Sequence, residues 1–244
     1  MKRTNLILTL VLTLCFALPM FGAAVTDSGR VPVLLELFTS EGCSSCPPAD
    51  RLLDKFDREQ PVAGAQLIVL SEHVDYWNHL GWSDPFSSPT YSQRQREYAS
   101  KLSANVYTPQ LVIDGTHEFV GSDRGEALRA IQKSIGEPKL PIGLSAKRDG
   151  DEADIHIDSA AAGNGLVYLV LAQDRAHSQV SRGENSGKSL DHVAVAYSFK
   201  KIGTQQKDIR VHLKPGSTRV IVFMQDPSNS RVLAVAQALV PANP

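Results

Sequence analysis

Two cysteines three residues apart are the residues of this 244-residue chain best suited to chemistry. Cys43 and Cys46 follow the apolar run 31–38, which predicts a buried strand, and precede apolar residues with helical spacing, Leu53 and Phe56 among them. A cysteine at the start of a helix faces unpaired N–H groups and the positive end of the helix dipole, and both favour the thiolate. We therefore predict that Cys43 is an exposed nucleophile with a lowered pKa, and that Cys46 resolves a mixed disulfide formed on it.

Two other interpretations of the cysteine pair are a structural Cys43–Cys46 bridge and a pair of zinc ligands. A closed zinc site takes four ligands, and the sequence contains no second C-x-x-C. The strand–loop–helix setting favours a redox-active pair.

The N-terminus has the features of a secretory signal peptide covering residues 1–24. Lys2 and Arg3 precede the apolar run 7–21, and small residues follow at 22–24; a retained anchor is the alternative. Removal of this segment leaves two cysteines, both in one motif, and export to the periplasm would place them in an oxidising compartment. We expect no membrane span after cleavage. With a net charge of −1 and no basic run, nucleic acid is not an expected partner.

The next segments predict a parallel β-α-β unit with a helical insertion. Residues 61–64 end the first helix, and the apolar run 66–70 predicts a second strand. The polar and aromatic residues 71–82 lie where open α/β sheets bind ligands, so Trp77 is a candidate substrate contact. The alternative is that these aromatic residues cap the core. Ser88-Pro89 predicts the start of a helix within an insertion near 73–104, with its arginines facing water.

A second motif begins at Thr108-Pro109, immediately before a predicted strand at 111–113. Asp114-Gly115 predicts a hairpin turn to another strand at 118–120. A proline at the entry to a strand can be cis, which exposes the preceding backbone to an incoming chain. Asp123 with Glu126 then forms a capping box for a last helix, which ends near residue 136.

This order of elements resembles the thioredoxin-like superfamily, and residues 108–115 with 121–123 are similar to its glutaredoxin version. The resemblance implies a cis Thr108–Pro109 bond packed against the disulfide, and it implies substrate contacts from Tyr107, Gly121 and Asp123. Residues 31–136, together with 182–185, also resemble an exported bacterial family catalogued as domain of unknown function 1223.

The chain departs from the thioredoxin pattern at two places. Ser44-Ser45 separates the cysteines where oxidoreductases of known direction usually carry other residues, which leaves the direction of electron flow open. Thioredoxins also keep a buried acid beneath the disulfide, and Glu36 is the candidate here. Desolvation would raise its pKa, so that it could relay a proton to Cys46. The alternative is a paired or hydrated carboxylate at the strand end.

Histidines in segments that should converge near the cysteines raise a second hypothesis. The histidines are His73, His79 and His117. Two cysteine thiolates and one histidine imidazole are a ligand set that suits Cu(I). Copper-delivery proteins of the thioredoxin-like superfamily use such a set, with cysteines spaced one residue wider. A Cu(I)-binding assembly factor with His73 as a ligand is therefore the alternative function, and a hydrogen-bonded His73 with no metal is preferred. The third hypothesis is a binding module with a structural disulfide.

From Lys139 onward the chain reads as short strands separated by turns, which resembles an antiparallel sandwich of the immunoglobulin class. The expected strands are 155–158, 166–172, 193–199, 209–213, 219–224 and 232–239. Residues 174–192 are a long polar link, which we interpret as an extended hairpin tip; the alternative is a lid or clamp over Cys43.

The sequence thus predicts a thioredoxin-like α/β domain at 25–137 and a β-sandwich-like domain at 138–244, behind the signal peptide. The predicted function is that of an exported thiol–disulfide oxidoreductase. Its expected partners are exported protein thiols or disulfides and a redox partner. No cofactor is expected besides the Cys43–Cys46 disulfide.

Overall fold

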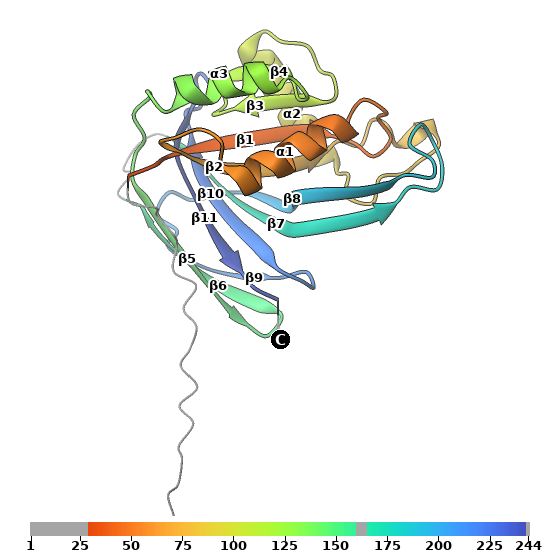
Figure 1. Cartoon of the computed structure of the whole chain (residues 1–244). Helices are drawn as coiled ribbons and strands as arrows, with labels where there is room; N and C mark the ends of the chain where they lie inside the picture. The colour runs from red at the N-terminus through yellow and green to blue at the C-terminus, as the bar shows by residue number, and fades with distance from the viewer. Residues whose placement is uncertain (1–28, 160–164, 243–244) are drawn as a thin grey trace, which may run out of the picture.

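The computed structural model describes residues 29–159 and 165–242 (Figure 1), so the predicted signal peptide lies outside the described residues. The thioredoxin-like part contains β1 (Val31–Thr39), α1 (Pro47–Glu59), β2 (Ala65–His73), the 3₁₀ turn η1 (Asn78–Leu80), α2 (Pro89–Leu102), β3 (Gln110–Ile113), β4 (His117–Val120) and α3 (Arg124–Ser134). The part that follows contains β5 (Ile142–Asp149), β6 (Glu152–Ser159), β7 (Leu166–Gln179), β8 (Ser189–Ile202), β9 (Asp208–His212), β10 (Thr218–Gln225) and β11 (Val232–Val240).

In the thioredoxin-like part, the helices and strands form where the local sequence signals predict them. β1 and β2 pair in parallel, as a strand–helix–strand unit requires. α2 begins as expected, with Ser88 accepting a hydrogen bond from the Thr90 N–H and a proline in the first turn. The β3–β4 hairpin turns at Asp114 and Gly115, whose φ angles are 49° and 70°. A Cβ on Gly115 would lie 1.9 Å from the carbonyl oxygen of Ser230, so both the turn and this close approach require glycine.

Strands from both parts form one continuous eight-stranded sheet. Its order is β11-β10-β7-β8-β2-β1-β3-β4, and β8 joins β2 in parallel through the Ser71–Val195 pair. The fold is therefore a mixed thioredoxin-like sheet with helices, followed by an antiparallel β region, as the sequence predicts. What the sequence did not predict is that β8 lies directly beside β2, because pairing between strands so far apart in the chain leaves no local signal.

Three strands of the antiparallel region form a second layer below the sheet. The three-stranded sheet β5-β6-β9 packs against β7, β10 and β11, and the apolar side chains of both layers form one buried cluster. This cluster contains no cysteine, so hydrophobic packing holds the layers together. No helix in the described ranges is long and apolar enough to cross a bilayer.

Side chains along β1 and β2 point alternately to the two faces of the sheet, and a different helix covers each face. Figure 1 shows α1 in front of these strands and α2 behind them. Phe38 lies in the apolar cluster with Tyr98 of α2, whereas Thr39 donates a hydrogen bond to Asp50 of α1. Since successive strand residues point to opposite faces, Glu36 shares the α2 face with Phe38.

Candidate functional site

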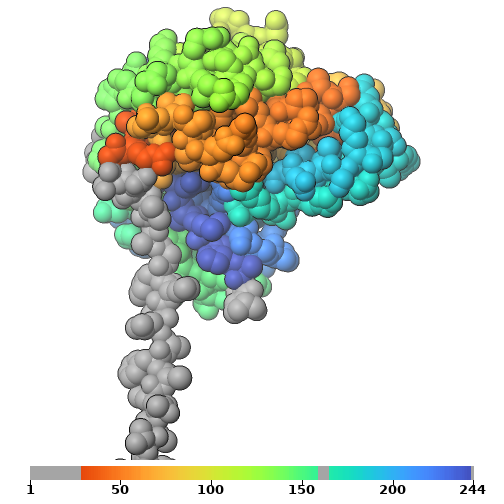
Figure 2. Space-filling model, in the orientation of Figure 1, coloured from red at the N-terminus to blue at the C-terminus, as the bar shows by residue number. Residues whose placement is uncertain are grey.

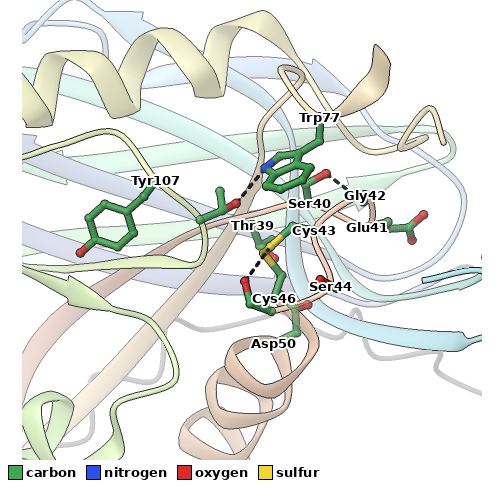
Figure 3. Close-up of a disulfide and its surroundings, with 12 residues drawn as sticks. Thr39, Ser40, Glu41, Gly42, Cys43, Ser44, Cys46, Asp50, Trp77 and Tyr107 are labelled. Carbon is green, nitrogen blue, oxygen red and sulfur yellow. Dashed lines mark hydrogen bonds between the residues drawn. A yellow bond between two sulfur atoms is a disulfide. The ribbon is translucent and has the colours of Figure 1, made fainter. Parts of the chain in front are cut away.

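A disulfide joins Cys43 and Cys46 in the loop between β1 and α1, with a Cα–Cα distance of 5.4 Å (Figure 3). Cys46 is the N-cap of α1, and prolines occupy the first two helical positions. Pro47 and Pro48 have no N–H, so this helix start offers fewer donors to a thiolate than the sequence argument assumed. The Ser44 N–H does point outward, but it already donates to the Glu184 carboxylate at 3.0 Å.

Both cysteines are buried, with 0 % of their surface exposed. The expectation of an exposed nucleophile is therefore wrong for this conformation. The covering layer is thin and polar, because Ser44, Ser45 and Glu184 are all exposed to solvent around the pair. The disulfide thus lies just beneath the surface.

The tip of the β7–β8 hairpin forms part of this cover. Figure 2 shows the tip (cyan) against the segment between β1 and α1 (orange). Asn185 is fully buried, and its side-chain amide donates to the carbonyl oxygens of Glu41 at 2.8 Å and Cys43 at 2.9 Å. Lys188 donates to the Asn185 Oδ1 at 2.8 Å. The polar segment 174–192 is thus mostly strand, and its tip, residues 180–188, folds over the disulfide loop.

The Thr108–Pro109 peptide bond is cis and lies beside the disulfide loop. The Trp77 Nε1 donates to the Thr108 Oγ1 at 2.8 Å (Figure 3), and a Cβ added to Gly42 would lie 3.0 Å from the Trp77 Cβ. Trp77 therefore bridges the residue before Cys43 and the residue before the cis-proline.

Gly121 fixes Pro109 against the start of α1. Its N–H donates to the Pro109 carbonyl oxygen at 2.9 Å. A Cβ at this position would lie 3.2 Å from the Ala49 Cβ and 2.7 Å from the Leu37 Cδ1, so a larger residue would push these elements apart.

Three of the predicted site residues have other partners. Tyr107 donates from its hydroxyl to Glu118 at 2.7 Å, and Figure 3 shows its ring directed away from the disulfide. The Asp123 carboxylate caps α3, because it accepts the Glu126 N–H at 2.9 Å. Glu36 is the third, and its placement corrects the sequence expectation.

Glu36 does not lie beneath the disulfide. It is fully buried on the α2 face, where the Arg94 Nε donates to it at 2.6 Å and the Tyr98 hydroxyl donates to the other oxygen. Arg94 is only 5 % exposed, so the prediction of solvated arginines fails for this residue. Glu72, also fully buried, lies 3.5 Å from the Arg94 Nε, and burial raises its pKa well above the usual value.

Asp50 is a buried acid on the disulfide side. It follows Cys46 by one helical turn, and its backbone N–H donates to the Cys46 carbonyl oxygen. Its Oδ1 accepts from the Thr39 hydroxyl at 2.8 Å, and burial raises its pKa. The i, i+4 spacing from Cys46 could have identified this residue from sequence alone.

His73 belongs to a buried polar cluster on the same face. The His73 Nδ1 lies 2.7 Å from the Asp84 Oδ2, and its ring centroid is 4.7 Å from that of His192. Burial alone would lower the pKa of His73, but Asp84 and the other nearby carboxylates raise it overall. Within 29–159 and 165–242, no three Cys, His, Asp or Glu side chains are arranged to hold a metal ion.

Comparison with known proteins agrees with the thioredoxin-like class that the fold and the disulfide define. The sequence model of the family described as "Protein of unknown function (DUF1223)" matches residues 34–225, so the chain belongs to this family. It is 33 % identical to thioredoxin from Methanocaldococcus jannaschii over 104 residues, which cover 42 % of this chain and 96 % of that protein. A crystal structure of an Agrobacterium tumefaciens protein is similar, with a TM-score of 0.64 and 31 % identity, covering 86 % of this chain and 94 % of that one.

Proposed function

We propose that this protein is a thiol–disulfide oxidoreductase that uses the Cys43–Cys46 pair on the thiols or disulfides of exported partners. The observation that carries the proposal is the position of the disulfide, at the start of α1 and bridged by Trp77 to the cis Thr108–Pro109 bond. Similarity to thioredoxin over most of that protein's length supports the same class of chemistry.

The exchange needs only the disulfide and a dithiol partner. A partner thiolate attacks the Cys43 sulfur, the S–S bond breaks, and the electron pair leaves on Cys46, which then takes up a proton. The partner's second thiol loses its proton and attacks the mixed disulfide, releasing Cys43 as a thiolate. The partner dithiol is oxidised and the Cys43–Cys46 disulfide is reduced; the reverse sequence reduces a partner disulfide and forms the Cys43–Cys46 disulfide again.

Access to the Cys43 sulfur requires movement of the covering layer. Among the described residues, the hydrogen bonds that anchor the tip at 180–188 to the disulfide loop come from Asn185 and Glu184. Displacing it would expose Cys43 and also release the Ser44 N–H from Glu184. A partner would then meet the sulfur beside the backbone at Thr108, which is the geometry that the exchange requires.

The test is exchange with a fluorescent disulfide peptide and with the corresponding dithiol. We expect the full chain without residues 1–24 to accelerate one of these reactions and Cys43→Ala to abolish the acceleration. The matched control is Ser45→Ala, which removes the hydroxyl 3.3 Å from the Cys43 sulfur but leaves both cysteines. Activity that survives in Cys43→Ala would overturn the proposal.

A second candidate function is a binding module in which the disulfide is only structural, and complete burial of both cysteines favours it. A structural disulfide differs from a redox-active one in its reduction potential, which should then be very low.

The Cu(I) hypothesis has its own test, a titration of the reduced wild-type protein and of the reduced His73→Ala variant with Cu(I). The proposal includes export, which cell fractionation of the full-length chain would test.

A further inference from the structure

His192 is buried on β8, the strand that joins the two parts of the sheet. Its Nε2 lies 3.2 Å from the Glu41 Oε1, and its Nδ1 lies 3.9 Å from the Asp50 Oδ2. Among the described residues, this Nδ1 has no hydrogen-bond partner. A buried imidazole nitrogen without a partner is costly, and this one has a carboxylate as its nearest charged neighbour.

Asp50 lies between His192 and the start of α1, one helical turn after Cys46. In a helix the Cα–Cβ bond is tilted toward the N-terminus, so the Asp50 side chain is directed back toward Cys46, four residues earlier. Figure 3 shows Asp50 directly below Cys46. Asp50 is only 5 % exposed, and its Oδ1 accepts from the Thr39 hydroxyl, which leaves the second carboxylate oxygen to face His192.

The titratable groups around His192 come from the β1–α1 loop, α1, the end of β2 and the segment after η1. We call them the histidine–carboxylate cluster, and its members are Glu41, Asp50, His73, Asp84 and His192. Burial raises the pKa of Glu41, but hydrogen bonds led by that from His192 lower it overall. His73 similarly lowers the pKa of Asp84, whose burial would otherwise raise it. These shifts favour the charged forms of Glu41 and Asp84, whereas burial raises the pKa of Asp50 and so favours its protonated form.

We propose that His192 is a positioning residue of the redox site, which holds a proton for Asp50 so that Asp50 can exchange it with Cys46. This inference rests on the proposed function, and it assigns a role in that function to β8. The antiparallel region would then complete the redox site by placing an imidazole beneath the disulfide.

The proton movement balances the exchange already described. When a partner thiolate attacks Cys43, Cys46 leaves as a thiolate and takes the carboxyl proton of Asp50, which recovers it from the imidazolium of His192. In the reverse direction Asp50 removes the proton from the Cys46 thiol as this sulfur attacks the mixed disulfide, and His192 takes the proton from Asp50. No further reactant is needed besides the partner dithiol or disulfide.

The test is the rate at which excess dithiothreitol reduces the oxidised protein, measured by acid quench and alkylation from pH 5.5 to 9. The ratio of wild-type to His192→Gln rate constants cancels the titration of dithiothreitol itself. We expect a ratio of about tenfold at pH 6, below the usual range for direct general acids because His192 acts through Asp50, and a fall toward one as the pH rises. The control is His177→Gln, an exposed histidine that pairs with Asp191 at 2.7 Å on the neighbouring strands.

A double-mutant comparison separates the relay from a structural effect. If one proton path passes through both residues, His192→Gln combined with Asp50→Asn should react no more slowly than Asp50→Asn alone. A ratio that does not change with pH, or effects that multiply in the double variant, would overturn the relay. If His192→Gln does not fold, Asp50→Asn tests the relay in its place. The ratio of wild-type to Asp50→Asn rate constants should also depend on pH, and a ratio that does not change with pH would overturn the relay.

These readouts are independent of partner turnover. A protein that accelerates no exchange with peptides, yet shows the pH-dependent ratio and the non-additive double variant, would refute the proposed function and support the relay.

Discussion

The side-chain amide of Asn185 donates to the carbonyl oxygen of Cys43 at 2.9 Å, across 142 positions of the chain. The same amide donates to the Glu41 carbonyl oxygen at 2.8 Å. These two bonds tie the β7–β8 tip to the loop that carries the disulfide, and they explain how a pair so close to the surface can be fully buried.

Asn185→Ala should loosen this cover. Loss of two buried hydrogen bonds weakens the closed state by about 1–3 kcal/mol, so we expect the rate of disulfide reduction by dithiothreitol at pH 7 to rise about tenfold. The control is Ser186→Ala, which changes an exposed neighbour whose hydroxyl donates to Ser181 within the tip. An unchanged rate in Asn185→Ala would show that the tip does not limit access.

Glu184→Gln should increase the reactivity of reduced Cys43. The Glu184 carboxylate occupies the Ser44 N–H and places a negative charge beside the sulfur, which disfavours a thiolate there. We expect alkylation by iodoacetamide at pH 7 to be about two- to threefold faster, and the difference to shrink in 1 M salt because the group is exposed. Glu137→Gln serves as a distant control, and equal effects of the two variants would refute the local charge effect.

Arg94→Met should destabilise the fold without changing the chemistry of the disulfide. Arg94 pairs with Glu36 and lies near Glu72, so its removal leaves buried carboxylates uncompensated, at a cost of about 3–5 kcal/mol. Urea unfolding measures the loss, with Arg96→Met on the exposed side of α2 as the control. Since these groups lie on the α2 face, the reduction potential should stay unchanged. A shifted potential would contradict the separation of the two faces.

The free energy of unfolding should fall as the pH rises above about 6.5, the usual pKa of histidine. The folded protein holds a proton on His73 more tightly than the unfolded chain does, because Asp84 outweighs the effect of burial. This contribution is complete below the unfolded pKa and disappears as the pH passes the higher folded pKa, with a slope of at most about 1.4 kcal/mol per pH unit. Urea titrations from pH 5.5 to 9 measure it, and His73→Gln should lose the slope. An equal slope in that variant would assign it to another group.

Local sequence patterns were sufficient for the elements that carry the disulfide and the cis-proline. Asp114-Gly115 gave the hairpin, and Ser88-Pro89 gave the start of α2. The expectation that Glu36 lies beneath the disulfide conflicts with the alternation of side chains along β1. Glu36 and Thr39 are separated by an odd number of positions, so they face opposite sides of the strand. The i, i+4 spacing from Cys46 would instead have selected Asp50, which accepts from Thr39 on the disulfide side.

The cover and the histidine–carboxylate cluster could not be predicted in this way. Asn185 and His192 reach the disulfide loop only because β8 pairs with β2, and that pairing depends on tertiary packing with no local signal. The burial of Cys43 therefore escaped a sequence argument that considered only the start of its own helix. The division of the chain at residue 137 stays a prediction, since the sheet runs across it.

The most direct test of the central claim is the reduction potential of the Cys43–Cys46 pair, measured by equilibration with glutathione buffers and alkylation of the reduced fraction. A redox-active pair should have a potential within the range of known oxidoreductases, about −120 to −270 mV. A potential below about −300 mV, the region of structural disulfides, would contradict the proposed exchange.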